Sequence, residues 1–319
     1  MIVSDFPTNL IQFQKQFGTE EACLKYIRKQ RWGSEDGFEC PKCKHKRAWS
    51  SKTREILICA SCERHLSITA GTQFHKTRKS LVLWFMAMYL MNTSKRGISA
   101  KELQRQLGLK SYQTAWAWLH KLRSGMIDPN RAALSGFVEV DETYYDGMCE
   151  GYPGRSTEKK ALVACAVEKI KNSCGRVRLS VIPNPSKETL KGFILGKIEL
   201  ESVLRTDGWV GYSGIDTVGY EHMPTKIGKK KSRTNEILPK VHRVFSLLKR
   251  WLLSTHQGAV SQKHLQAYLE EFTFRFNRRT AKNLTHPFQR MTKGAVRTQA
   301  TPYWKIIGRT APNVPLAKA

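Results

Sequence analysis

The chain has 319 residues, 40% of them hydrophobic, and its 54 Lys and Arg against 26 Asp and Glu give a formal net charge of +28. This length excludes a single small domain and predicts two or three domains with real hydrophobic cores. A charge this large exceeds what solubility needs and indicates a partner with a phosphate backbone.

The hydropathy of the chain predicts no membrane-spanning segment. The first residues, Met1 to Asp5, show no basic region followed by an apolar stretch, so no signal peptide is expected. The longest apolar run, from Leu81 to Met91, is too short to span a bilayer. We therefore expect no membrane partner, and we expect this run to form a buried helix.

Residues 1–37 are predicted to be a helical segment, with an amphipathic helix from about Glu20 to Gln30. Residues 38–76 are predicted to be a small β module. Short β segments are expected around its apolar positions, which are Trp49, Ile56, Leu57, Ile58 and Ile68.

Two tight cysteine pairs mark this β module as a zinc ribbon. Cys40 and Cys43 form one pair, Cys59 and Cys62 form the other, and the stretch from Lys44 to Ile58 separates them. Each pair can bring two thiolates onto one ion, and two pairs close a tetrahedral zinc site without an open position. We expect a structural zinc that supplies much of the module's folding free energy. The unpaired cysteines are interpreted as reduced thiols: Cys23, Cys149, Cys165 and Cys174.

Residues 77–130 are predicted to be a helix-turn-helix-like DNA-binding region. Ser80 can cap a helix through the apolar run, and Ser99 with Glu102 predicts a capping box before a second helix. A turn at Gly108 precedes a third helix that starts at Ser111. The side chains expected to face DNA are Tyr112, Gln113, His120, Lys121 and Arg123. The alternative interpretation is a plain helical hairpin.

Residues 131–285 are predicted to be an α/β domain. The candidate strands are Phe137–Tyr145, Lys160–Glu168, Val177–Ile182 and Ser202–Thr206, and the candidate helices are Pro185–Lys197, Leu238–Leu253 and Gln262–Asn277. A basic loop from Lys226 to Arg233 offers phosphate-binding candidates Lys229, Lys230 and Lys231. Residues 286–319 are interpreted as a basic tail that lies on nucleic acid, because the chain from Phe272 onward is rich in Lys and Arg and contains no acidic side chain.

Two aspartates lie where metal chemistry at a sheet edge would need them. Strand alternation places Asp141 and Glu139 on one face and Val138 and Val140 on the other. Asp207 follows a strand and precedes Gly208, which suits either a metal ligand or a simple Asp-Gly turn. Carboxylates on strand ends can hold Mg²⁺ for two-metal phosphoryl transfer.

The basic helix that follows can complete such a site. His242 and Lys249 are separated by two helical turns, so they share one helix face. His242 can face the carboxylates, while Lys249 and Arg250 can reach phosphates.

These segments together resemble bacterial insertion-sequence transposases of the DDE class with an N-terminal zinc ribbon, the insertion-sequence fifteen-ninety-five family. The resemblance covers about residues 5 to 290. The segments that carry it are the cysteine pairs, Val138 to Tyr144, Thr206 to Trp209, His242 to Trp251 and His264 to Arg279.

The resemblance implies a multidomain α+β protein with a ribonuclease-H-like catalytic domain. It also implies a structural zinc and catalytic Mg²⁺ or Mn²⁺ ions, with cleavage at the terminal inverted repeats and strand transfer into target DNA. Asp141 and Asp207 match the first two acidic positions, and Lys249 matches the basic residue two turns after the third. Double-stranded DNA and a homodimer or higher oligomer are the implied partners, in the bacterial cytoplasm at the nucleoid.

The third acidic position departs from the pattern, because it falls on His242, although its spacing from Asp207 suits the DDE class. His242 can ligate a metal, better with Mn²⁺, or act as a general base. Alternatively an acid replaces it, with Glu139, Glu142 and Glu236 as candidates, or the site is degenerate. Two further functions stay open: a DNA-binding regulator that needs neither Asp141 nor Asp207, and a structure-selective nuclease that cuts DNA without joining ends.

Overall fold

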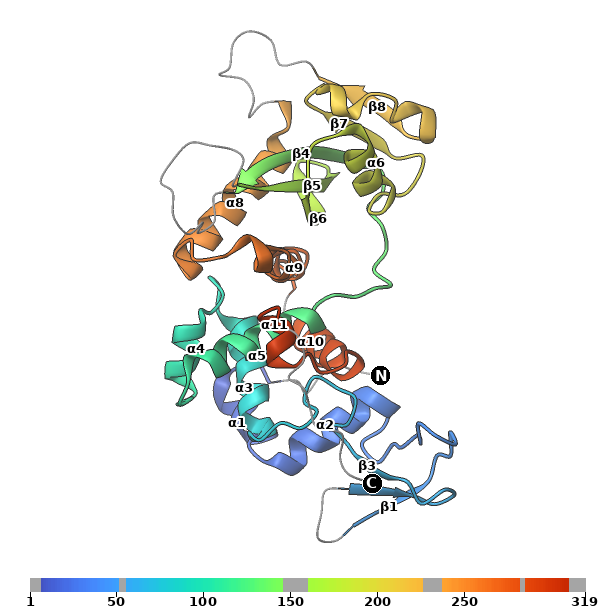
Figure 1. Ribbon diagram of the computed structural model, residues 1–319, viewed down its shortest axis with the longest axis vertical. Helices are drawn as coiled ribbons and strands as arrows, with labels where there is room; N and C mark the ends of the chain where they lie inside the picture. Colours follow the sequence, from blue (N-terminus) through green and yellow to red (C-terminus); the bar gives the residue numbers. More distant parts are fainter. Residues whose placement is uncertain (1–6, 52–55, 146–159, 226–236, 282–284, 310–319) are drawn as a thin grey trace. The chain divides into compact units, whose positions relative to one another are not determined.

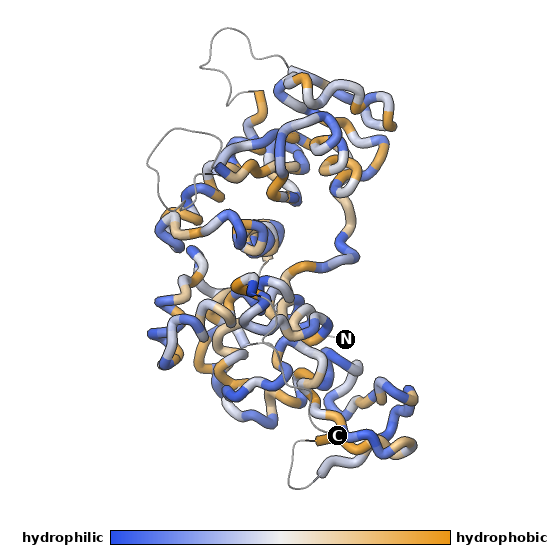
Figure 2. Tube along the Cα trace, in the orientation of Figure 1, coloured by the Kyte–Doolittle hydropathy of each residue, from blue (hydrophilic) through white to orange (hydrophobic). Residues whose placement is uncertain are grey.

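The computed structural model describes residues 7–51, 56–145, 160–225, 237–281 and 285–309 (Figure 1). The chain divides into two compact units. Unit 1 combines residues 1–128 with 281–319, and unit 2 comprises residues 129–280. Hydrophobic and hydrophilic positions are interspersed along the tubes of both units (Figure 2). The predicted multidomain α+β class is confirmed.

The predicted zinc ribbon is a three-stranded antiparallel sheet in unit 1. Strands β1 (Ala48–Ser50), β2 (Ile56–Cys59) and β3 (His65–Ser67) lie in the order β1-β2-β3. Leu57 pairs with Leu66 across β2 and β3, and both side chains are buried. Ile68 lies just after β3 and is also buried. Among the described residues of the module, the buried apolar side chains are few: Phe38, Leu57, Leu66, Ile68 and Phe74.

The other secondary-structure elements described in unit 1 are helices. They are α1 (Leu10–Phe17), α2 (Glu20–Trp32), α3 (Leu81–Thr93), α4 (Ala100–Gln106), α5 (Tyr112–Gly125), α10 (Thr285–Arg297) and α11 (Tyr303–Ile306). The predicted serine caps at Ser80 and Ser99 are confirmed, since their hydroxyls accept from the amides of Val82 and Glu102. The second half of the predicted capping box is not formed, because the Glu102 carboxylate accepts from Arg105 and Gln106 instead. Helix α1 was not predicted. The apolar run is buried within α3, as expected.

The interpretation of residues 286–319 as a basic tail is wrong for its first part. Residues Thr285–Arg297 form α10, which packs on α2, α3 and α5. Phe288, Met291 and Ala295 recur at helical spacing and are buried. The lack of acidic residues suggested an arm that lies on DNA. The helical spacing of the apolar side chains instead makes this segment a helix packed in unit 1. Residues 310–319 lie outside the described residues.

Helices α5 and α10 cross at two glycines. A Cβ on Gly294 would come within 1.6 Å of the Gly125 carbonyl oxygen, so only glycine fits there. After α10, the chain is fixed by Gln73, whose amide nitrogen donates to the carbonyl of Gln299 and to the hydroxyl of Ser124. The segment after unit 2 is therefore an integral part of unit 1.

Unit 2 is built on a five-stranded mixed sheet. Its strands are β4 (Phe137–Tyr145), β5 (Ala161–Ile170), β6 (Ser173–Ile182), β7 (Val203–Thr206) and β8 (Glu221–Pro224), in the order β6-β5-β4-β7-β8. Strand β5 is antiparallel to both β4 and β6, while β7 runs parallel to β4 and β8 parallel to β7. This arrangement agrees with the predicted ribonuclease-H-like domain.

Both faces of the sheet are covered. One face packs against α8 (Pro239–His256) and α9 (Gln262–Phe276). The other packs against α6 (Lys187–Leu195), η1 (Val210–Tyr212) and η2 (Asp216–Val218). Strand β5 is accordingly buried from Ala161 to Glu168, as expected for a strand covered on both faces.

Two differences from the predicted elements have local causes. Strand β6 begins at Ser173 rather than Val177, because β5 and β6 form a tight hairpin in which Lys171 adopts a left-handed conformation with φ 53°. Strand β8 was not predicted, since its four residues are mostly exposed at the sheet edge and show no apolar alternation. None of the helices in the described ranges combines the length and apolar character that crossing a bilayer requires.

Two ion pairs fix the segment that leads into β4. Glu168 pairs with Arg176 and accepts from the amide of Ser135 at 3.0 Å. Arg131 pairs with Glu270 at 2.7 Å, with both side chains largely buried. The start of unit 2 is therefore tied to β5, β6 and α9.

Candidate metal and nucleic-acid sites

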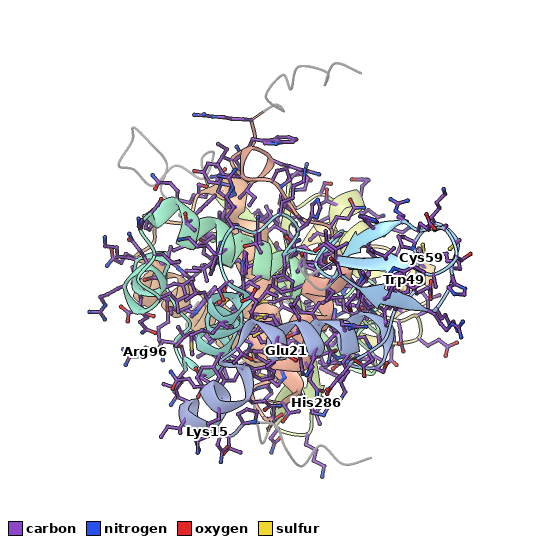
Figure 3. The ribbon with its side chains drawn as sticks, turned by 90° about the horizontal axis from the view of Figure 1, so that it is seen from below. Lys15, Glu21, Trp49, Cys59, Arg96 and His286 are labelled. Atoms are coloured by element: carbon purple, nitrogen blue, oxygen red, sulfur yellow. The ribbon has the colours of Figure 1, made fainter. Side chains whose placement is uncertain are left out.

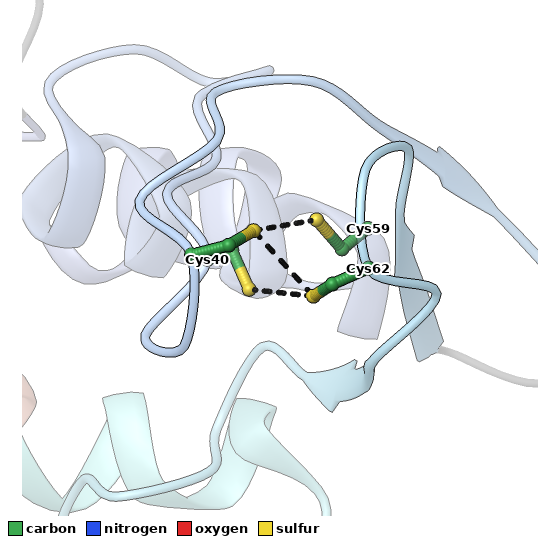
Figure 4. Close-up of side chains that lie close together, drawn as sticks. Cys40, Cys59 and Cys62 are labelled. Atoms are coloured by element: carbon green, nitrogen blue, oxygen red, sulfur yellow. Dashed lines mark hydrogen bonds between the residues drawn. The ribbon is translucent and has the colours of Figure 1, made fainter.

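The four predicted zinc ligands converge. Their sulfur atoms all lie within 4.8 Å of one another, and the Cys40–Cys62 and Cys43–Cys59 Sγ pairs are 3.6 and 3.5 Å apart (Figure 4). Four sulfurs about 2.3 Å from a tetrahedral zinc would lie about 3.8 Å apart. The chemistry and spacing of the cluster therefore fit a structural zinc.

The same backbone turn presents each cysteine pair. The carbonyl of Cys40 accepts from the amide of Lys44, and the carbonyl of Cys59 accepts from the amide of Glu63. Lys44 and Glu63 both adopt left-handed conformations, with φ 61° and 55°. Two copies of one local turn thus aim four sulfurs at one point.

Asp141 lies on β4, and Asp207 directly follows β7, the parallel strand beside it. Strand β4 pairs with β7 in the register Phe137↔Val203, Val138↔Leu204 and Glu139↔Arg205. Continuing this register by two residues places Asp207 opposite Asp141. Asp207 accepts from the amide of Trp209 in a turn where Gly208 has φ 80°, so the predicted Asp-Gly turn and the sheet-edge carboxylate occur together.

Asp141 is buried close to two other carboxylates. Its side chain is buried, and burial together with the nearby Glu142 and Asp207 carboxylates raises its pKa to about 7, although the Glu142 amide opposes this rise. A cation bound between these carboxylates would stabilise their ionised forms.

Helix α8 brings His242 and Lys249 to the same face of β4. The Nε2 atom of His242 lies 3.8 Å from Oδ2 of Asp141. Burial lowers the pKa of His242 below its usual 6.5, so its imidazole is neutral at neutral pH. Lys249 is exposed, and its ammonium donates to Oγ1 of Thr143 at 2.9 Å.

The two described glutamates beside Asp141 have other partners. Glu139 is 1% exposed, and its carboxylate accepts from the amides of Lys240 and Val241. Glu142 accepts from the hydroxyl of Tyr212 at 2.5 Å. Glu139 is thus a poor candidate for the third ligand. Glu236, the other alternative, lies outside the described residues.

The residues named for DNA contact differ in exposure. Tyr112 and Gln113, in the first turn of α5, are exposed. The expected exposure of His120 and Arg123 is wrong: they are 7% and 1% exposed. The physical reason is that α4, α10 and α11 all pack on α5 and cover its later turns. Lys121 is half-buried, Arg250 is exposed, and Lys229, Lys230 and Lys231 lie outside the described residues.

The zinc ribbon carries an exposed aromatic side chain on a basic module. Trp49 is 52% exposed on β1, in the strand beside Cys59 (Figure 3). Arg47, His65 and Arg64 are exposed near it in the sequence and in the strand register. Lys15 and Arg96 also project from unit 1 in Figure 3. Basic side chains interleaved with an aromatic ring suit contact with nucleic acid.

Two supporting residues, Thr143 and Tyr212, had no sequence signal of their own, and Glu139 was considered only as a ligand and not as a helix cap. The hydrogen bonds of these three residues reach partners 70 to 106 residues away. Strand alternation predicted the shared face of Glu139 and Asp141, and the structure adds Thr143 to it.

Comparisons with known proteins match the two regions of the chain that contain these candidate sites. Residues 18–65 match the transposase zinc-ribbon domain, and residues 133–277 match the ISXO2-like transposase domain. A protein of Halobacterium salinarum, named as an uncharacterized protein in transposable element ISH50, is 26% identical over 287 residues. That similarity covers 82% of this chain and 92% of the relative.

The two matched regions contain the cysteine cluster and the carboxylate–histidine face, respectively, and together they span more than half of the chain. A DDE-type domain of this kind belongs to DNA-processing enzymes. The chain therefore belongs to the insertion-sequence fifteen-ninety-five family of transposases, with a zinc ribbon ahead of its DDE domain.

Proposed function

We propose that this transposase binds the terminal inverted repeats of an insertion sequence and catalyses metal-dependent DNA cleavage and strand transfer. The observation that supports the proposal is the parallel pairing of β4 with β7, whose register runs from Glu139↔Arg205 toward Asp141 and Asp207, with Nε2 of His242 3.8 Å from Oδ2 of Asp141. These three groups are the proposed catalytic set, an Asp-Asp-His variant of the DDE pattern.

The donor set fits a divalent cation. Two carboxylates suit Mg²⁺, and a neutral imidazole nitrogen favours Mn²⁺ relative to Mg²⁺. Among the described residues, only the four cysteines place three or more potential ligand atoms within 4.8 Å of one another. The ligand atoms of Asp141, Asp207 and His242 are therefore more widely spaced than those of the cysteine cluster. When bound, such ions supply an activated nucleophilic oxygen and stabilise the leaving oxygen in phosphoryl transfer.

Other side chains of unit 2 can position the DNA. Thr143 holds the Lys249 ammonium on the same face of β4 as Asp141, where it can pair with a phosphate beside the scissile bond. Arg250 is exposed on α8 and provides a second cation for the backbone. The Lys229–Lys231 run is proposed to add further phosphate contacts.

We assign recognition of the transposon ends to unit 1. The zinc ribbon and the first turn of α5, with Tyr112 and Gln113, supply its exposed candidate contacts, and Lys121 remains a peripheral one. His120 is not part of that exposed surface. Because two ends must be held together, a homodimer or higher oligomer on DNA is proposed. Affinity should fall steeply with salt, since each phosphate contact releases counterions.

The test is strand transfer of a labelled end oligonucleotide with Mg²⁺ or Mn²⁺. Asp207→Asn and His242→Ala should each lower the rate by at least about 100-fold, because even outer-shell changes around a metal cost about 10- to 100-fold. Asp216→Asn is the matched control, since Asp216 is an exposed acid of the same unit. End binding measured on the same variants should stay unchanged.

The other outcomes separate the alternatives. Cleavage without joining would support a nuclease and contradict strand transfer. End binding by the wild type with neither cleavage nor joining, in either metal, would contradict catalysis and support a regulator. Full activity of His242→Ala would remove His242 from the catalytic set.

A further inference from the structure

Helix α8 begins without a cap of its own. Its N-cap position is Leu238, which offers no side-chain acceptor, and Pro239 occupies the first turn. The amides of Lys240 and Val241 therefore need an acceptor from elsewhere, because the first donors of a helix have no partner within it. His242, which follows directly, is the first residue whose amide bonds within the helix, to the carbonyl of Leu238.

Glu139 provides that acceptor from the sheet. Its Oε2 atom accepts from the amide of Lys240 at 2.7 Å and from the amide of Val241 at 3.1 Å. The side chain is 1% exposed, so water does not compete for these bonds. A carboxylate at a helix N-terminus also gains from the positive end of the helix dipole. Glu139 thus caps a helix that begins far later in the chain.

The cap also fixes the helix against the strand. Glu139, Asp141 and Thr143 alternate along β4 and share one face. Each has a partner on α8: the Lys240 and Val241 amides for Glu139, His242 for Asp141, and Lys249 for Thr143. The Glu139 contact is the most buried of the three, and it lies at the end of α8 nearest His242.

We infer that Glu139 is a positioning residue that sets the distance between His242 and Asp141 by capping α8. This inference rests on the proposed function for its catalytic meaning, although the cap itself is independent of it. Glu139 acts through the backbone of the first turn of α8. It is therefore not a replacement for the third acidic residue but the support for His242 in that position.

Three substitutions separate the parts of this role. Glu139→Gln keeps an acceptor oxygen at the same reach and removes the charge. Glu139→Leu keeps the approximate size and removes the acceptor. Val244→Ala is the matched control, because Val244 is fully buried on the same helix but lies beyond the cap.

The first readout is amide hydrogen exchange of the peptide covering residues 239–245. Glu139→Leu should raise the exchange of Lys240 and Val241 at least about 10-fold relative to β5, whereas Glu139→Gln should stay close to the wild type. Val244→Ala should not raise exchange selectively in the first turn. Unchanged protection in Glu139→Leu would overturn the inference whether or not the protein is a transposase.

The second readout is strand transfer at saturating end DNA. Glu139→Leu should lose about 10- to 100-fold in rate with unchanged affinity for the ends, and Glu139→Gln should recover most of it. Equal loss in both variants would overturn the acceptor role. If the wild type shows no strand transfer, the proposed function fails, but the exchange experiment still decides whether Glu139 caps α8.

Discussion

The two candidate metal sites of this protein are assembled in opposite ways. The cysteine cluster comes from two copies of one short turn, and all four ligands lie between Cys40 and Cys62. The acidic site takes Asp141 from β4, Asp207 from the end of β7 and His242 from α8. The first site depends on local backbone geometry plus an ion, whereas the second depends on the whole fold of unit 2.

This difference predicts how each site fails. The described residues of the ribbon bury few apolar side chains, so the ribbon should lose its fold once its ion is lost. The acidic site is supported by a sheet covered on both faces, so changes to a ligand should remove chemistry and leave the fold. The predictions below test this contrast, from the largest expected effect to the smallest.

Loss of the zinc site should unfold the ribbon. Structural zinc contributes about 10–16 kcal/mol in small zinc modules. Cys59→Ser, at a fully buried ligand position, should therefore abolish zinc retention and the exchange protection of β1–β3. Cys174→Ser, at an unpaired cysteine of unit 2, is the control and should keep both. A ribbon that stays protected after zinc removal would show that its small core suffices.

Removal of the Phe288 side chain should destabilise unit 1 by about 3–5 kcal/mol. Its ring lies 5.4, 5.7 and 5.7 Å from those of Phe13, Phe17 and Phe85, so it joins α10 to α1 and α3. The measurement is exchange of the α3 amides in Phe288→Ala. His286→Ala, at an exposed position of the same helix, should change stability by less than about 0.5 kcal/mol. Equal effects of the two changes would show that the packing of α10 does not stabilise unit 1.

Glu168→Gln should lower the free energy of unfolding of unit 2 by about 2 kcal/mol at pH 7, as expected for a buried hydrogen-bonded charge. Burial alone would raise the pKa of Glu168, but Arg176 and the amides of Ser135 and Arg176 outweigh it and lower the pKa below 4.5. A lowered carboxyl pKa stabilises the fold above the ordinary pKa, and this contribution is lost as pH falls through the folded-state value.

The difference between wild type and Glu168→Gln should therefore shrink as the pH falls below 4.5. Denaturant titration at several pH values measures it. Glu221→Gln, at an exposed position of β8, provides the control. A difference that is independent of pH would show that shape, not charge, makes the contribution of Glu168.

The sequence predicted best what is local. Cysteine spacing identified the ribbon, period-two alternation identified β4 with its observed ends, and serine caps identified the starts of α3 and α4. The faces of β4 were also predictable, because Val138 and Val140 enter one core while Glu139 and Asp141 face α8.

Nonlocal contacts account for what the sequence did not show. The expected exposure of His120 and Arg123 failed because α10, from the far end of the chain, covers α5. The cap of α8 could not be predicted from the sequence, because its acceptor, Glu139, lies on a strand far earlier in the chain. A hydrophobic period in residues 288–296 was present in the sequence, but the basic composition of that segment led to its interpretation as a tail.

The most direct test of the central claim is iron-mediated cleavage of the protein backbone, with Fe²⁺ in place of the catalytic ion. If Asp141 and Asp207 hold one ion between adjacent strands, hydroxyl radicals should cut near both residues. Excess Mg²⁺ should suppress both cuts, and Asp207→Asn should abolish both together. Cuts near only one aspartate, or cuts near Asp141 that survive Asp207→Asn, would contradict a shared metal site.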